Sequence, residues 1–242
     1  MTIVDDIGRR MKRNYEDRTR YMLPRRTYTV IRLDGKAFHT WSKKAGLVKP
    51  YDESFAKSID DAANFLFDES QGAVLAYTQS DEISLVLQDF DKPRTEAWFD
   101  GNVQKLASVS ASLVTGAFNY AVSVNDAAPD GTPLAYFDAR VFTIPDKVEV
   151  QNYLIWRQQD CIRNSIIGAA QAHFSHKDLH GKSCYDMKAM IAETTSPWQS
   201  YHDRFKFGGL ITKDTMGVAF PFRENQDKLG ELIPTIWEND NV

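Results

Sequence analysis

The chain has 242 residues, and its 29 basic and 33 acidic side chains give a formal net charge of −4. A hydrophobic fraction of 43% and a charged fraction of 26% are ordinary for a globular protein and exclude disordered, collagen-like and fibrous classes. No apolar run approaches the ~18 residues of a membrane helix, the acidic start is unlike a secretory signal, and two cysteines cannot build a disulfide framework. We therefore expect a cytoplasmic protein without a membrane anchor.

The first part of the chain predicts a basic helix, a strand and a second helix. Apolar residues spaced four apart predict a helix over 3–20, which Pro24 ends. These apolar residues are Ile3, Ile7, Met11 and Tyr15. A β-branched run predicts a strand over 28–33, followed by a loop. Asp52 is a good N-cap for a helix that continues to about Glu69.

The middle of the chain predicts a hairpin, and two long helices with a strand between them. Two β-rich runs over 73–77 and 83–87 are separated by only five residues, which is typical of a hairpin. The further elements expected are a helix over 95–120, a strand over 134–144 and a helix opened by Pro145 and Asp146 that ends near His173. Weaker patterns predict a helix over 185–192 and strands over 209–212 and 217–220.

This order of elements contains two β-α-β units and predicts an α+β fold of the ferredoxin-like type, βαββαβ, with an extra N-terminal helix. In that arrangement strand one lies beside strand three, and we expect the helices to lie on one face of the sheet. No linker divides the sequence, so we expect one catalytic domain over 1–180 that includes the basic helix. Residues 181–242 are expected to form a C-terminal extension that packs on it and does not fold independently.

Charge is distributed unevenly along the chain. Residues 1–49 hold 13 of the 29 basic residues and five acidic ones, whereas the remaining residues are acidic overall. A basic first fifth on an acidic body is typical of a surface that contacts phosphates. The same residues could line the solvated side of a helix, so charge alone leaves both interpretations open.

Acidic residues occur at the ends of two strands that this topology places side by side. Asp34 and Gly35 end the first strand, and Asp81 and Glu82 lie at the turn of the hairpin. Neighbouring strands are ~4.8 Å apart, so these carboxylates could share a pair of metal ions, and Mg²⁺ prefers such oxygen ligands. Two ions ~3.5–4 Å apart can hold a triphosphate and stabilise the leaving group of an in-line displacement. Either motif alone is common in turns that bind nothing, and it is their combination that favours a metal site.

Other catalytic motifs are weak in this sequence. It contains neither GxGxxG nor a P-loop motif, the fingerprints of dinucleotide and P-loop sites. His173, His176 and His180 have helical spacing, but no cysteine or carboxylate at matching spacing completes a zinc site. Ser80 has no evident base partner that would make it a nucleophile, and Cys161 is expected to be a small core residue.

Five segments of the sequence are similar to one enzyme family. They read Arg32-Leu-Asp-Gly-Lys-Ala-Phe-His39, Lys49-Pro-Tyr-Asp52, Ala76-Tyr-Thr-Gln-Ser-Asp-Glu82, Phe137-Asp-Ala-Arg140 and Trp156-Arg-Gln158. In this order, over about residues 5–210, they resemble the tRNA-histidine guanylyltransferase superfamily. The resemblance implies a polymerase- or cyclase-type palm, two Mg²⁺ ions, ATP and GTP as nucleotides, and a homotetramer. It also implies activation of the 5′ end of tRNA by ATP before nucleotides are added in the 3′–5′ direction.

The resemblance also implies roles for individual residues. Asp34 and Asp81 would ligate both metals, the Gly35 carbonyl would complete the shell, and Glu82 would support it. The activating triphosphate would lie on the backbone of Gly35, Lys36, Ala37, Phe38 and His39. Lys49, Asp52 and Ser80 would surround the base and sugar of that nucleotide. Further contacts with a triphosphate or with tRNA are expected at Arg32, Lys105, Arg140, Asn164 and Lys182.

One segment departs from the family pattern. Members dedicated to tRNA-histidine carry His-Ile-Asn-Asn after the Trp-Arg-Gln segment, where this chain has Cys161-Ile-Arg-Asn-Ser165. The departure favours templated repair of 5′-truncated tRNA over addition of one G to tRNA-histidine. A palm-type nucleotidyl cyclase and a catalytically silent RNA-binding protein remain as competing functions.

Overall fold

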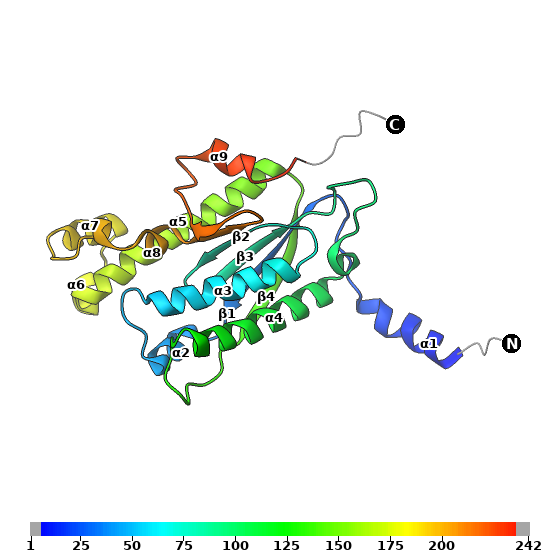
Figure 1. Ribbon diagram of the computed structural model, residues 1–242, viewed down its shortest axis with the longest axis horizontal. Helices are drawn as coiled ribbons and strands as arrows, with labels where there is room; N and C mark the ends of the chain where they lie inside the picture. The colour runs from blue at the N-terminus through cyan, green and yellow to red at the C-terminus, as the bar shows by residue number, and fades with distance from the viewer. Residues whose placement is uncertain (1–5, 236–242) are drawn as a thin grey trace.

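The computed structural model describes residues 6–235, and a six-stranded antiparallel sheet forms its centre (Figure 1). The strand order is β4-β1-β3-β2-β5-β6. The strands are β1 Tyr28–Gly35, β2 Ala73–Gln79, β3 Glu82–Leu87, β4 Phe137–Ile144, β5 Gly209–Thr212 and β6 Met216–Val218.

Helices connect these strands and follow them along the chain. The α-helices are α1 Asp6–Asn14, α2 Phe38–Ala45, α3 Glu53–Glu69, α4 Val103–Val124, α5 Lys147–His173, α6 His176–Leu179, α7 Cys184–Ala192, α8 Asp203–Phe207 and α9 Gln226–Glu231. Three short 3-10 helices cover Glu16–Thr19, Trp98–Gly101 and Trp198–Ser200. Among residues 6–235, no helix has both the length and the apolar content needed to cross a bilayer.

The first four strands confirm the α+β, ferredoxin-like prediction. β1 lies between β3 and β4, and β2 lies on the other side of β3. In the register of these strands, Asp34 is opposite Glu82 of β3 and also opposite Asp138 of β4. The topology therefore brings the end of β1 and the turn of the β2–β3 hairpin to one edge of the sheet.

Helices cover both faces of the sheet, so the expectation that they lie on one face was wrong for α5. In Figure 1, α3 and α4 lie side by side in front of the sheet, where they pack on Ile31 and Ile83. α5 and the C-terminal segments pack on the opposite face, over Val30 and Val86. The reason is that successive residues of β1 and β3 are apolar on both faces, and both faces must then be buried.

The N-terminal helix is shorter than the predicted range of 3–20. α1 ends at Asn14, and residues 3–5 lie outside the described residues. Its predicted apolar face is exposed, at 66% for Ile7, 41% for Met11 and 66% for Tyr15. The sheet does not bury this face because α1 projects away from it (Figure 1).

The segment predicted as a loop before Asp52 contains the helix α2. Ala37 adopts a left-handed conformation with φ of 56° and turns the chain out of β1. Phe38, Trp41 and Ala45 then bury one face of the helix, and the left-handed Gly46 ends it. Eight residues are too few for this spacing to be distinguished from a loop by pattern alone.

The remaining elements agree in type with their predictions and differ at some ends. As predicted, the Asp52 carboxylate caps α3 and that of Asp146 caps α5. The helix predicted from residue 95 begins only at Val103, because Phe99 and Asp100 have positive φ values and interrupt it.

The predictions for the C-terminal part of the chain also agree in type with the observed elements. The helix over 185–192 and the strand over 209–212 are confirmed as α7 and β5, and the strand predicted over 217–220 is observed as β6 at Met216–Val218. β5 pairs with β2, so this part of the chain adds strands to the central sheet.

Candidate functional site

Asp34 and Asp81 lie at neighbouring strand ends. Asp34 is the penultimate residue of β1. Asp81 belongs to a two-residue turn between β2 and β3, whose first residue, Ser80, has a positive φ of 46°. Positive φ at this position matches the twist of the flanking strands in a tight hairpin. Asp81 directly precedes Glu82, which is the register partner of Asp34, so the tight turn places Asp81 next to the end of β1.

The electrostatics of the two aspartates fit a divalent cation. Burial, together with the nearby charges of Asp34 and Glu82, raises the pKa of Asp81 to about 6, although hydrogen bonds from its own backbone and from Ser80 oppose this rise. Among the described residues, neither Asp34 nor Asp81 forms an ion pair with a basic side chain. Two close carboxylates without a cationic partner form the type of oxygen donor set that Mg²⁺ takes.

Glu82 faces a different partner, Arg157 of α5. Arg157 donates from Nε to Oε1 of Glu82 at 2.7 Å and from Nη2 to Oε2 at 2.8 Å. This bidentate pair occupies both carboxylate oxygens and ties the hairpin turn to α5. Within the part of the chain that the structure describes, no group of three or more His, Cys, Asp or Glu side chains could hold a metal ion. A metal site here would therefore use Asp34, Asp81 and the Gly35 carbonyl, with Glu82 fixed beside them.

The chain after Asp34 turns tightly from β1 into α2. Lys36 donates its backbone N–H to the Tyr136 carbonyl at 2.8 Å, and α2 begins at Phe38 without a side-chain cap. A Cβ on Gly35 would lie 2.2 Å from Cδ2 of Phe38. Glycine is thus required for the ring to pack against the turn, and the uncapped N–H groups of the helix start favour an anion.

We expect Gly35→Ala to destabilise the protein by about 1–3 kcal/mol, because the new methyl group overpacks a site that cannot relax. The Phe38 ring is held against Trp41, Phe118 and Phe137 and has no free space to move into. Thermal and urea unfolding would measure the loss.

Gly116→Ala is the matched control for this substitution. Gly116 lies within α4, and a Cβ there would meet nothing within 4 Å. The control should gain about 0.5–1 kcal/mol from helix propensity. If both variants changed stability alike, the close packing of Gly35 against Phe38 would be refuted.

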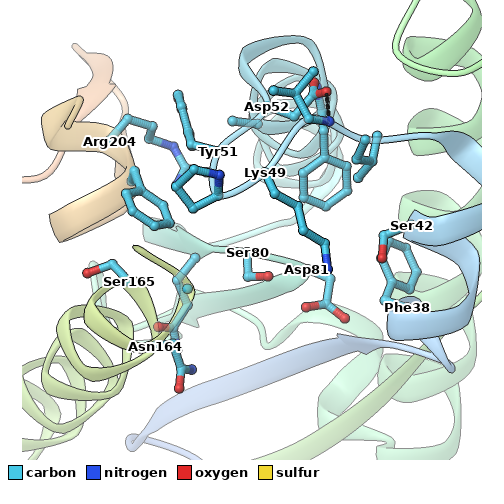
Figure 2. Close-up of a pocket in the computed structure, with 18 of the residues that line it drawn as sticks. Phe38, Ser42, Lys49, Tyr51, Asp52, Ser80, Asp81, Asn164, Ser165 and Arg204 are labelled. Atoms are coloured by element: carbon cyan, nitrogen blue, oxygen red, sulfur yellow. Dashed lines mark hydrogen bonds between the residues drawn. The ribbon is translucent and has the colours of Figure 1, made fainter. Parts of the chain in front are cut away.

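A cavity of about 400 Å³ opens beside Asp81 (Figure 2). Predicted site residues that line it are Phe38, His39, Lys49, Asp52, Ser80, Asp81 and Asn164. Figure 2 shows the Lys49 side chain reaching across the cavity toward Asp81, with Asn164 entering from α5. The cavity therefore joins a cation, polar groups and the acidic turn within one space large enough for a small ligand.

Asp52 shapes this cavity through its backbone contacts. One carboxylate oxygen accepts from the Phe55 N–H at 2.9 Å, and the other accepts from the Val48 N–H at 2.9 Å. The side chain therefore caps α3 and fastens the loop that carries Lys49.

The other predicted contact residues lie outside the lining of the cavity. Arg32 and Arg140 are directly opposite each other on β1 and β4. Lys105 is in the first turn of α4, with its Nζ 5.8 Å from the centre of the Phe99 ring, and Lys182 lies between α6 and α7. Glu82, Lys36 and Ala37 flank the acidic pair without lining the cavity.

No sequence pattern predicts that α8 contributes to the cavity wall. Arg204 and Phe205 line the cavity, and Arg204 is only 6% exposed. Its guanidinium donates to both carboxylate oxygens of Asp60, at 2.9 and 2.8 Å, and to the Thr78 hydroxyl at 2.9 Å. These partners are more than a hundred residues away in the chain, so no local pattern could have revealed the contact.

Cys161 also lines the cavity, and its environment confirms the core interpretation. It is 6% exposed, and burial raises the pKa of its thiol to about 11. A thiol in this state is protonated at neutral pH and is not a nucleophile.

The chain is similar in sequence and in fold to known proteins. A family profile described as tRNAHis guanylyltransferase matches residues 9–145. A solved bacterial tRNA(His) guanylyltransferase-like protein in complex with ATP is 38% identical, with a TM-score of 0.87 over 94% of this chain and 99% of its own. A second solved structure with the same description, in complex with GTP, is 34% identical, with a TM-score of 0.77 over the same shares.

A curated relative from Debaryomyces hansenii, a tRNA(His) guanylyltransferase, is 32% identical over 62% of this chain. The chain spans 55% of that protein, about half the length of the curated guanylyltransferases it matches. The profile covers more than half of the chain, and the fold of the ATP-bound structure matches 94% of it. The chain therefore belongs to the tRNAHis guanylyltransferase family of nucleotidyltransferases.

Proposed function

We propose that this protein is a 3′–5′ nucleotidyltransferase that adds nucleotides to the 5′ end of tRNA. The observation that carries the proposal is the meeting of Asp34 and Asp81 at one sheet edge beside a cavity lined by Lys49 and Ser80. In the reaction, the 5′-phosphate of the RNA first attacks the α-phosphate of ATP and pyrophosphate leaves, which gives an adenylylated 5′ end. The 3′-hydroxyl of the incoming nucleotide then attacks the 5′-phosphate of the RNA, the hydroxyl proton is lost to solvent and AMP leaves. This is an in-line phosphoryl transfer, for which positioning and charge stabilisation supply most of the catalysis.

The carboxylates of Asp34 and Asp81 and the carbonyl of Gly35 would hold two Mg²⁺ ions. When bound, the ions supply charge stabilisation for the triphosphate and for the leaving group. Glu82, fixed by Arg157, keeps the turn of Asp81 in place. The uncapped start of α2 offers backbone N–H groups to the phosphates.

The cavity is proposed to bind the activating ATP and then GTP or another templated nucleotide. Its volume of about 400 Å³ falls in the range of small-ligand sites. Two similar solved structures of bacterial tRNA(His) guanylyltransferase-like protein contain ATP and GTP, which supports this assignment. Lys49, Ser80 and Asn164 are the polar side chains proposed to meet the base and sugar. Arg32, Arg140, Lys105 and Lys182 are proposed to contact phosphates of the RNA or of a second nucleotide.

We further propose that the reaction is templated repair of 5′-truncated tRNA. Support comes from Cys161-Ile-Arg-Asn-Ser165, which differs from the His-Ile-Asn-Asn block of members dedicated to tRNA-histidine and whose Cys161, Asn164 and Ser165 line the cavity. In templated addition, base pairing selects the nucleotide and the protein contacts backbone and shape. A homotetramer, with residues 1–180 as the catalytic palm and 181–242 as an extension packed on it, completes the proposal.

The lengths of the products made from tRNAs that lack one, two or three 5′ nucleotides test this proposal. We expect Mg²⁺-dependent addition of one, two or three nucleotides, with synthesis stopping where the acceptor stem is fully paired. Changing the opposite template base should change which nucleotide is added.

Three results separate the competing functions. Incubation with ATP or GTP alone should give no cyclic product, since a cyclase would need no RNA. Addition of a single G regardless of truncation or template would instead identify G addition to tRNA-histidine. Binding of tRNA that EDTA does not affect, without any turnover, would refute an enzymatic role.

A further inference from the structure

Trp156 of α5 lies beside Arg157, which holds Glu82, and it has no part in the proposed function. It is 52% exposed, although tryptophan is highly buried on average. The guanidinium of Arg157 lies 4.5 Å from the centre of its ring, and that of Arg32 lies 5.9 Å from it. An exposed indole beside guanidinium groups has the composition of a site on which nucleic acid bases stack.

The register of β1 relates Trp156 to the acidic pair. Arg32 and Asp34 are two residues apart on the strand, so they point to the same face, about 6.6 Å apart along it. Arg157, the neighbour of Trp156, reaches Glu82 at the hairpin turn. Of the two guanidinium neighbours of the indole, one comes from β1 two residues before Asp34, and the other holds Glu82 at the hairpin turn.

Two arginines, one of them within 5.9 Å of the ring centre, face each other across β1 and β4 beside this ring. Arg32 of β1 and Arg140 of β4 are direct partners in the antiparallel register, and like charges directly opposite each other are destabilising. Neither arginine forms an ion pair within residues 6–235. A bound phosphate would relieve this repulsion, with its attached base next to the indole.

We propose that Trp156 is a stacking platform for the base of the RNA nucleotide at the reacting 5′ end. This rests on the proposed function and adds to it a contact that does not depend on base identity, because every base has a π-face. The platform fixes where the end of the RNA lies relative to Asp34, and the choice of nucleotide remains with base pairing.

Binding measurements with two RNAs test the platform without requiring turnover. One is a 5′-triphosphorylated tRNA that lacks its first nucleotide, and the other is the same RNA with an abasic 5′-terminal nucleotide. The parent protein should bind the abasic RNA about tenfold more weakly, in line with the loss of one stacked base. Trp156→Ala should bind both RNAs equally, at the affinity that the parent shows for the abasic RNA. Trp156→Phe should restore most of the difference.

Tyr120→Ala is the matched control. Tyr120 is a 74% exposed aromatic residue on α4, which covers the other face of the sheet, and its loss should leave the tenfold difference intact. If Trp156→Ala weakened both RNAs but kept the tenfold difference, the ring would serve only the fold and the proposal would be wrong. Equal binding of the two RNAs by the parent would also overturn it. A parent protein without any affinity for tRNA would instead refute the proposed function, so the two failures can be told apart.

Discussion

Asp81→Asn should reduce nucleotide addition by about a thousandfold or more, because it removes one of two carboxylates that would hold the metal ions. Asparagine keeps the shape of the side chain and the hairpin turn, so the loss should appear in the rate of single-turnover extension and not in the fold. Added Mg²⁺ should raise the melting temperature of the parent protein and have little effect on the variant.

Asp68→Asn makes the same chemical change at an exposed position of α3 and should keep parental activity. Extension by Asp81→Asn at the parental rate would refute the assignment of the acidic pair as the metal site.

Asp81→Asn should also stabilise the metal-free protein at neutral pH. The folded state raises the pKa of Asp81 from 3.8 to about 6, so folding disfavours its charged form. The parent is therefore most stable with respect to this group below pH 4, and it loses stability as the pH rises to about 6. Above that range, Asp81→Asn should be more stable than the parent by about 1–2 kcal/mol, a value reduced for partial solvent screening. Urea unfolding at pH 4 and pH 8 would measure this difference, which should vanish at the lower pH.

Arg157→Ala should destabilise the protein by about 3 kcal/mol, because it leaves the Glu82 carboxylate without its cation next to two other acids. The side chains of Arg157 and Glu82 are only 8% and 13% exposed, and both hydrogen bonds of the pair would be lost. Arg157→Lys should give an intermediate value, since lysine keeps the charge and loses the bidentate geometry. Urea unfolding of both variants provides the measurement.

Arg163→Ala, on the same helix, is the matched control. Arg163 pairs with Asp160 but its side chain is 59% exposed, so its loss should cost less than about 1 kcal/mol. The double variant Arg157→Ala/Glu82→Gln should recover about 1–3 kcal/mol relative to the sum of the single changes. Additive single changes would show that the pair does not stabilise the turn.

Local sequence patterns predicted most elements because their causes are local. The caps at Asp52 and Asp146 depend on a side chain and the three residues after it, and the hairpin depends on its short turn. α2 was missed because its helical pattern spans only eight residues. α4 begins later than predicted because Phe99 and Asp100 adopt positive φ, a conformation that is uncommon for residues other than glycine.

By itself, the sequence determined the family, the ferredoxin-like strand order and the placement of Asp34 and Asp81 at adjacent strand ends. These follow from short motifs and from the fixed geometry of strand pairing. Only the tertiary structure decided that Arg157 holds Glu82, that Arg204 of α8 closes the cavity against Asp60, and that Trp156 stays exposed beside Arg32. Such contacts join segments from 75 to 144 residues apart, and their partners are set by how α5 and α8 pack on the sheet, which no local pattern encodes.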